Sequence, residues 1–195
     1  MICAIIHTCD KYEFCWDTWY RQFKLYWDSD IDVYFVNESK DIDYDLKQIK
    51  TGPGEWSDRL IKALDQLDYE YIFYMQEDAW MTRAVRFDYY YSVMKAYHMD
   101  ALRLFPAKGK YYKITADKKF RGDSDYLVTH QPSIWRKSFL SECLIPSEDP
   151  WQNELKGTER IRGKGYDIRC ADTYEWYISA CRKGQLTNEA KELMK

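Results

Sequence analysis

Short apolar runs alternate along this chain with longer segments of helical periodicity, and this alternation restricts the available folds more than any other feature. Residues 2–8, 32–38 and 71–75 are apolar runs typical of buried strands, and residues 12–27 and 57–67 have apolar positions at helical spacing. Strands separated by helices form parallel sheets that are covered on both faces. The sequence therefore predicts an α/β fold with a mainly parallel central sheet and helices on both faces.

The second part of the chain continues this pattern. We expect strands over 101–106 and 166–172, and helices over 87–99, over a segment with Trp135, Phe139 and Cys143 at i, i+4 and i+8, over 150–161 and in the basic tail. At 195 residues the chain has the length of one domain.

The composition limits the setting in which the chain works. Its net charge of −3 gives no sign that the chain as a whole binds nucleic acid or a membrane. The N-terminal apolar run is too short for a signal sequence or a membrane span. Six cysteines without a C-x-x-C pair indicate free thiols in a reducing cytoplasm. The 18 Tyr and 8 Trp suit a site for flat rings such as bases or sugars, although packing accounts for most of them.

Two adjacent carboxylates, Glu77 and Asp78, follow the apolar run of residues 71–75. In a parallel sheet, ligands bind at the carboxyl ends of the strands. Mg²⁺ and Mn²⁺ are held there by one or two carboxylates together with substrate phosphates. The pair is therefore a candidate site for a metal and a diphosphate, with a solvated turn or a helix cap as the alternative.

A glycine-containing loop, residues 50–56, leads into the next expected helix. Free backbone N–H groups and the positive end of the helix dipole favour an anion at such a junction. The loop is neither a Walker motif nor a G-x-G-x-x-G fingerprint. Arg59 is placed to reach a phosphate or to pair with Glu77 or Asp78, and Ser57 is the expected N-cap.

Three carboxylates, Glu148, Asp149 and Glu154, surround the Pro150–Trp151 pair at the start of a helix. Asp149 is a natural N-cap before proline, which is a structural role. The apolar ring of a neighbouring tryptophan can also raise the pKa of a carboxylate, and a carboxylate with a raised pKa is suited to proton abstraction.

The segment 108–122 carries six Lys or Arg against one acidic residue, with Tyr111, Tyr112 and Phe120 interleaved. Basic groups for phosphates and aromatic rings for bases are typical of nucleic-acid binding. A solvated, charged hairpin is the alternative.

In this order, these stretches resemble the GT-A type of nucleotide-sugar glycosyltransferase, especially its small viral and bacterial members, over nearly the whole chain. "IIHTCDKY" is similar to the first strand with its base-binding loop, and "YFVNE" to the second strand, whose end meets the nucleoside. "GEWSDRLIKAL" resembles the donor-binding helix, and "YIFYMQEDAW" stands where the family has its D-x-D metal motif. "HQPSIWRKSFL" and "EDPWQNELKG" resemble the acceptor-side segment with its catalytic carboxylate.

The resemblance implies one GT-A-like, Rossmann-like domain over 1–195, with a donor half at 1–80 and an acceptor half at 81–195. It implies a nucleotide-diphosphate sugar, expected to be a UDP-sugar, and Mn²⁺ or Mg²⁺ held by Asp78 and Glu77. Gln76 replaces the first aspartate of D-x-D, so metal dependence is open. The donor-binding residues implied are Thr8, Asp10, Asn37, Glu38, Asp58, Arg59 and Gln76, and the candidate bases are Glu154, Asp149 and Glu148.

The acceptor is not identified by the sequence. Small viral members of this kind modify hydroxymethylated bases in phage DNA, so duplex DNA, reached in the host cytoplasm, stands beside a glycan as the expected acceptor. A glycoside hydrolase with the same carboxylates, or a non-catalytic module that binds carbohydrate or nucleic acid, remains the alternative. The sugar, the stereochemical outcome and the oligomeric state are left open.

Overall fold

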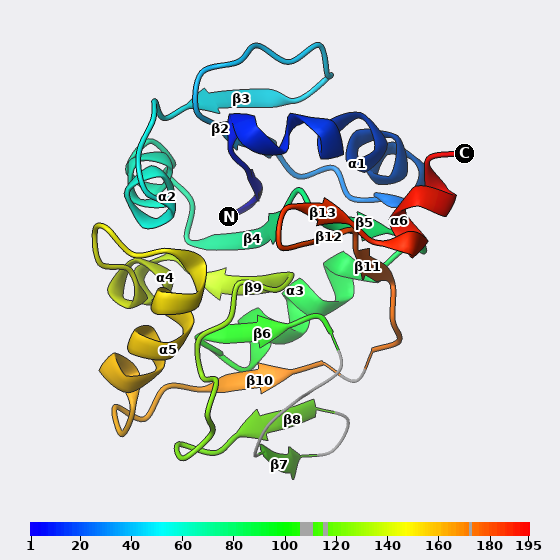
Figure 1. Ribbon diagram of the computed structural model, residues 1–195. Coiled ribbons are helices and arrows are strands. Elements are labelled where there is room, and N and C mark those ends of the chain that lie inside the picture. Colours follow the sequence, from blue (N-terminus) through cyan, green and yellow to red (C-terminus); the bar gives the residue numbers. More distant parts are fainter. Residues whose placement is uncertain (106–110, 115–116, 172) are drawn as a thin grey trace.

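The computed structural model describes residues 1–105, 111–114, 117–171 and 173–195, with side chains given outside 111–118 (Figure 1). Nine strands form one sheet in the order β3-β2-β1-β4-β9-β6-β10-β8-β7. Their bounds are β1 Ile2–His7, β2 Val33–Asn37, β3 Lys47–Lys50, β4 Tyr71–Gln76, β6 Ala101–Arg103, β7 Tyr111–Ile114, β8 Asp117–Phe120, β9 Ser133–Arg136 and β10 Ile168–Cys170.

Seven of the nine strands run in the same direction, and β9 and β8 run opposite to them. β1 pairs in parallel with β2 and β4, β2 with β3, and β6 with β10. β9 is inserted antiparallel between β4 and β6, and β8 pairs antiparallel with β10 and β7. The prediction of an α/β fold with a mainly parallel central sheet is confirmed.

Both faces of the sheet are buried. Successive side chains of a strand point to opposite faces, so a continuous apolar run such as β4 needs a core on each side. In β4, Phe73 and Met75 pack into one core and Ile72 and Tyr74 into the other. The first core is covered by α1 (Glu13–Tyr26) and α3 (Phe87–Ala96), and the second by α2 (Trp56–Asp65), α4 (Lys137–Cys143) and α5 (Pro150–Ile161). No described helix is long and apolar enough to cross a membrane.

The sequence-based prediction failed around Trp135. This residue lies in strand β9, where it pairs with Ile72 and Ala101, and the helix begins only at Lys137. Spacings of four and eight residues place side chains on one face of a strand as well as of a helix, so the spacing alone did not separate the two. Ser57 also does not cap α2: Glu55 occupies the N-cap position, and the Ser57 hydroxyl accepts a hydrogen bond from the Glu148 backbone N–H at 2.9 Å.

The tail, predicted as helical, begins with short strands and becomes helical only near its end. β11 (Tyr177–Ser179) pairs antiparallel with β5 (Ala79–Met81), which directly follows Glu77 and Asp78. β12 (Cys181–Arg182) and β13 (Gln185–Leu186) then form a hairpin, and only α6 (Asn188–Leu193) is helical. Lys183 and Gly184 have φ angles of 52° and 75°, as a two-residue hairpin turn requires. This arrangement brings β11 and the β12–β13 hairpin close to the carboxyl end of β4 (Figure 1).

Candidate functional site

A cavity of about 470 Å³ opens at the carboxyl ends of β1 and β4. Its walls come from the loops after these strands, from the first turns of α2 and α5, from the segment before β9 and from the β12–β13 hairpin. The lining residues are His7, Thr8, Cys9, Tyr12, Trp56, Arg59, Gln76, Glu77, Asp78, His130, Gln131, Pro150, Trp151, Glu154, Ser179, Cys181, Arg182 and Lys183.

The structure separates the residues singled out from the sequence into two groups. Thr8, Arg59, Gln76, Glu77, Asp78 and Glu154 line the cavity. The described lining does not include the other six residues, which are Asp10, Asn37, Glu38, Asp58, Glu148 and Asp149.

Asp10 joins the loop after β1 to the loop after β2. Its carboxylate accepts hydrogen bonds from Asn37 Nδ2 at 3.2 Å and from the backbone N–H groups of Ser39 and Lys40 at 3.1 and 3.2 Å. Burial alone raises the pKa of Asp10, but the hydrogen bonds from Ser39 and its neighbours outweigh it and leave the pKa below its usual value. The network fixes the shape of the loop that borders the cavity.

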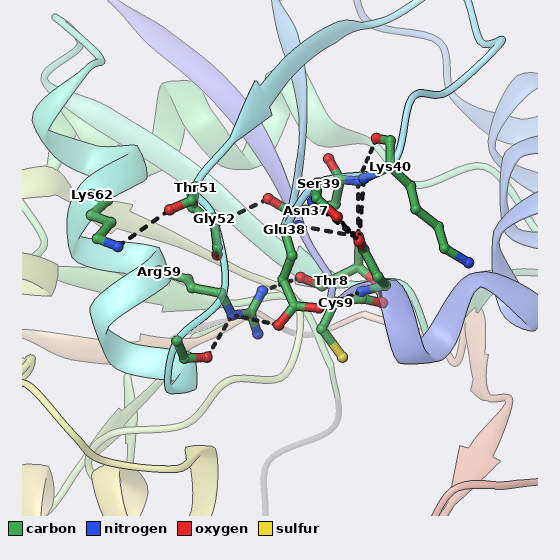
Figure 2. Close-up of polar contacts among 12 residues, drawn as sticks. Thr8, Cys9, Asn37, Glu38, Ser39, Lys40, Thr51, Gly52, Arg59 and Lys62 are labelled. Atoms are coloured by element: carbon green, nitrogen blue, oxygen red, sulfur yellow. Dashed lines mark hydrogen bonds and ion pairs between the residues drawn. The ribbon is translucent and has the colours of Figure 1, made fainter.

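Arg59 extends from α2 to the end of β1 and is only 5% exposed. Its Nε donates to the Gly54 carbonyl at 3.2 Å, and its guanidinium donates to the Thr8 carbonyl (Figure 2). Glu38 Oε1 lies 3.9 Å from Arg59 Nε, while Glu38 Oε2 accepts from the Asp10 backbone N–H at 2.9 Å. The described ion pair of Arg59 is therefore with Glu38, and the pairing with Glu77 or Asp78 considered from the sequence is not found among the described ion pairs.

Asp58 has a role in packing. Its carboxylate accepts a hydrogen bond from the Ser147 backbone N–H at 3.2 Å. This contact holds the loop before α5 against α2.

Glu77 is buried, and the adjacent Asp78 is half-buried. Burial raises the pKa of both groups, and the charge of Asp78 raises that of Glu77 further. The Thr8 hydroxyl and Arg59 act in the opposite direction on Glu77, as the Ser179 hydroxyl does on Asp78. Neither carboxylate has an ion pair among the described side chains.

These properties match the donor set of a hard divalent cation. Two adjacent carboxylates that form no ion pair among the described side chains would be stabilised by Mg²⁺ or Mn²⁺, which accept carboxylate oxygens together with phosphates and water. The described residues hold no group of three or more His, Cys, Asp or Glu that could ligate a metal by itself. The pair therefore fits a metal that the substrate helps to bind.

Of the three carboxylates near α5, only Glu154 lines the cavity. It accepts hydrogen bonds from the Thr129 hydroxyl at 3.0 Å and from the His130 backbone N–H at 2.8 Å. Burial raises the pKa of Glu154 above its usual value, against the effect of these hydrogen bonds and of Arg103.

Glu148 and Asp149 have structural partners instead. Glu148 is 4% exposed and accepts from both guanidinium nitrogens of Arg160, at 2.8 and 2.9 Å, and from Asn153 Nδ2 at 2.8 Å. Asp149 caps α5 by accepting from the Gln152 backbone N–H at 2.8 Å, and Gln152 completes a capping box. The geometry thus leaves Glu154 as the base candidate that faces the cavity.

Several lining residues were missed by the sequence analysis. Trp151 lies at the cavity mouth and is 71% exposed. His7 and His130 are buried, and the sequence analysis did not single out either residue as part of the site. Because the tail was predicted to be helical, Arg182 and Lys183 were not expected at the cavity. The glycine at position 184, in a turn with positive φ angles, was the available signal for a hairpin.

The basic segment 108–122 is described only in part. Residues 108–110, 115 and 116 lie outside the described residues. Lys119 Nζ lies 3.5 Å from Asp167 Oδ1, and none of residues 119–122 lines the cavity. The prediction that this segment borders the acceptor side remains a prediction.

Comparison with solved structures adds the fold type. S. aureus TarS 1–349 in complex with UDP-GlcNAc has a TM-score of 0.63 at 15% identity, over 95% of this chain and 60% of that one. The mannosyltransferase PcManGT from Pyrobaculum calidifontis, with GDP-Man and Mn²⁺, has a TM-score of 0.61 at 11% identity, over 94% and 58%. A CMP:2-keto-3-deoxy-manno-octonic acid synthetase complexed with CTP has a TM-score of 0.58 at 14% identity, over 100% and 95%.

The chain has the GT-A, Rossmann-like type of fold. It spans less than two thirds of the TarS 1–349 and mannosyltransferase chains. No protein-family model and no curated protein matches the sequence. At these identities the likeness concerns the fold, and the activity has to be argued from the cavity.

Proposed function

We propose that this protein is a glycosyltransferase that moves a sugar from a nucleotide-diphosphate sugar to an acceptor hydroxyl. The observation that carries the proposal is the layout of one cavity. Glu77, which is buried, and Asp78, which is half-buried, lie on one wall without an ion pair among the described side chains. The half-buried carboxylate of Glu154 lies on the wall formed by α5.

The donor half, residues 1–80, would hold the nucleotide. Thr8 and Arg59 line the cavity, and the network of Asp10, Asn37 and Glu38 shapes the loop beside them. We assign the nucleoside to this loop and the diphosphate to the space beside Arg59, Gln76 and the acidic pair. A UDP-sugar is the proposed donor.

Asp78 and Glu77 would hold Mn²⁺ or Mg²⁺, which supplies positive charge for the leaving diphosphate. Arg59 contributes a fixed positive charge on the same side. Arg182 and Lys183, from the hairpin, add two more cationic side chains to the lining. Charge that develops on the diphosphate as the glycosidic bond breaks is stabilised by groups of this kind.

Glu154 would act as the base within the acceptor half, residues 81–195. A carboxyl with a raised pKa takes a proton more readily than an ordinary one while still being ionised near neutral pH. In the proposed step the acceptor oxygen bonds to the anomeric carbon, the bond from that carbon to the diphosphate breaks, and the acceptor proton passes to Glu154. Glu148 and Asp149, held by Arg160 and by the α5 cap, are left with structural roles.

A glycan is the acceptor that the described residues favour. Trp151, exposed at the mouth of the cavity three residues before Glu154, offers an apolar surface against which a sugar ring can stack. Duplex DNA with hydroxymethylated bases remains the second candidate, on the charge of segment 108–122.

Calorimetry with UDP, UDP-glucose, UDP-N-acetylglucosamine and GDP-mannose, each with and without Mn²⁺, tests the proposal. We expect micromolar to millimolar binding of at least one nucleotide-sugar, and weaker binding in Arg59→Ala. If none of the four ligands binds, the site has another function. Release of the nucleotide in the presence of oligosaccharides or of hydroxymethylcytosine DNA then separates the two acceptors.

A further inference from the structure

Two buried histidines that line the cavity each have one ring nitrogen without a partner among the described residues. His7 ends β1 and is 1% exposed, and His130 precedes β9 and is 3% exposed. Among the described residues, His7 Nε2 and His130 Nδ1 have no hydrogen-bond partner. Because an unpaired polar atom in a buried position costs stability, each of these atoms is a site where a ligand would compensate.

The neighbours of His7 determine which nitrogen carries its proton. Trp56 Nε1 can only donate, and it donates to the Tyr74 hydroxyl oxygen at 3.2 Å. Tyr74 has a single hydroxyl proton, and the acceptor that the described contacts offer for it is His7 Nδ1, at 3.2 Å. Burial and the nearby Arg59 hold the pKa of His7 well below its usual value, so the ring is neutral. The proton is therefore on Nε2, and the unpaired atom is a donor.

The same reasoning gives the opposite result for His130. The amide of Asn153 donates through Nδ2 to the Cys143 carbonyl at 2.9 Å and to Glu148 Oε2 at 2.8 Å. Its Oδ1 must then accept from His130 Nε2, at 2.9 Å. Burial lowers the pKa of His130 to about 3, so this ring is also neutral. The unpaired Nδ1 carries a lone pair and is an acceptor.

Both rings lie close to Trp56, and each histidine is connected to one part of the proposed reaction centre. The centroid of the Trp56 ring is 5.6 Å from that of His7 and 4.2 Å from that of His130. His7 pairs with Gln76, the residue before Glu77, in the β1–β4 register. His130 donates its backbone N–H to Glu154. The group that lies between the diphosphate and the base in a glycosyl transfer is the transferred sugar.

We propose that His7 Nε2–H and His130 Nδ1 recognise two hydroxyl groups of the transferred sugar, one as a hydrogen-bond donor and the other as an acceptor. This inference rests on the proposed function and names the part of the donor that these residues bind. A sugar lacking one of the two hydroxyls leaves a buried polar atom unpaired, and such sites reject deoxy analogues strongly. The pair therefore selects for a hydroxylated sugar ring packed against Trp56.

Asparagine and glutamine offer matched replacements, because their amide groups occupy the places of Nδ1 and Nε2 respectively. His7→Asn keeps an acceptor for Tyr74 and removes the unpaired donor. His130→Gln keeps the bond to Asn153 and removes the unpaired acceptor. The control variants His7→Gln and His130→Asn do the reverse, so they retain the group proposed to meet the ligand and lose the structural bond.

Calorimetry should compare UDP with UDP-glucose, UDP-N-acetylglucosamine and GDP-mannose in the wild type and all four variants. We expect His7→Asn and His130→Gln to bind UDP within about two-fold of the wild type, and to bind the preferred nucleotide-sugar about ten-fold more weakly. The control variants should retain more of that preference while melting at lower temperature. Unchanged preference in His7→Asn and His130→Gln would overturn the inference and leave the proposed function standing. Failure of the wild type to bind any of the four ligands would overturn the proposed function and, with it, the inference.

A measurement without variants tests the premise. Long-range ¹H–¹⁵N spectra of the histidine rings report which nitrogen carries the proton. We expect neutral rings protonated at Nε2 for both His7 and His130 at pH 7. A charged ring, or a proton on Nδ1 of either residue, contradicts the assignment of donor and acceptor.

Discussion

The backbone N–H of His130 donates to Glu154 Oε1 at 2.8 Å, and this bond ties the segment before the antiparallel strand β9 to the first turns of α5. Glu154 is therefore held from outside its own helix, at a fixed position on the wall of the cavity. Burial raises its pKa, and the bonds from His130 and Thr129 limit that rise. These contacts orient a carboxylate that is a stronger base than one in water.

The pH dependence of activity should report this environment. Glu154 must be ionised to accept a proton, and its pKa lies above the usual value near 4.5. Activity is then lost as the pH falls through that raised pKa. We expect the acid limb of the kcat/KM profile above pH 4.5. Full activity at pH 4.5 would show that another group is the base.

Asp149 is expected to matter for stability and not for turnover. Asp149→Ala removes the α5 cap, which is worth about 1 kcal/mol, and the melting temperature should fall by about 2–4 °C. Calorimetric scanning measures the shift, and kcat should stay within about two-fold of the wild type because only a cap is lost. A loss of kcat without a fall in melting temperature would return Asp149 to the list of bases.

Glu148 and Arg160 form a pair whose separation is costly. Glu148→Gln leaves the guanidinium of Arg160 without its charged partner in a largely buried position. We expect a loss of about 3 kcal/mol in the free energy of unfolding, measured by urea denaturation. The double variant Glu148→Gln, Arg160→Met should recover part of that loss. Equal stability of Glu148→Gln and wild type would contradict the structural role.

His130 should make the protein sensitive to acid. Its folded pKa of about 3 lies below the unfolded value near 6.5, so the stability that it contributes is complete above pH 6.5. As the pH falls from 6.5 toward 3, the unfolded state binds the proton and that contribution is lost by about 1.4 kcal/mol per pH unit. Glu77, Asp78 and Glu154 act oppositely, because carboxyls with raised pKa values gain protons more readily in the folded state.

The comparison with His130→Gln isolates the histidine from these carboxyls. As the pH falls below 6.5, the unfolding free energy of the wild type should decrease relative to that of His130→Gln. Parallel stability curves for the two proteins would mean that His130 is not buried as a neutral ring.

The metal should act through the acidic pair. Asp78→Asn removes one negative charge without a change in size, and we expect it to abolish the Mn²⁺-dependent part of UDP binding while the metal-independent part remains. Titrations of UDP with and without Mn²⁺ separate the two parts. Glu142→Gln, a surface variant remote from the cavity lining, is the control and should bind like the wild type. Identical Mn²⁺ dependence in Asp78→Asn and wild type would place the metal elsewhere.

The sequence indicated the elements with strong local signals. The apolar run of β4 and its acidic end lie where the pattern put them, and α5 spans 150–161 because Pro150 and the Asp149 cap define its start. Trp135 was assigned to a helix because its spacing to Phe139 fits both periods. The β12–β13 hairpin was missed because strands of two residues carry no periodicity.

The site was less predictable than the fold because its residues depend on contacts distant in sequence. In the sequence Glu148 resembles a catalytic carboxylate. Only the structure shows that Arg160, twelve residues later, forms an ion pair with it. The roles of His7 and His130 follow from Tyr74 and Asn153, which no local pattern connects to them. Arg59 lines the same cavity as the acidic pair, yet its described ion pair is with Glu38.

The most direct test of the central claim is nucleotide release from a nucleotide-sugar by the wild type and by Glu154→Gln. With UDP- and GDP-sugars, Mn²⁺ and an oligosaccharide mixture, we predict release by the wild type and a rate at least about 100-fold lower in Glu154→Gln. The affinity of Glu154→Gln for the donor, measured on the same preparation, should remain within about two-fold because the base acts in the transition state. No release by the wild type from any donor, or equal release by Glu154→Gln, would contradict the account.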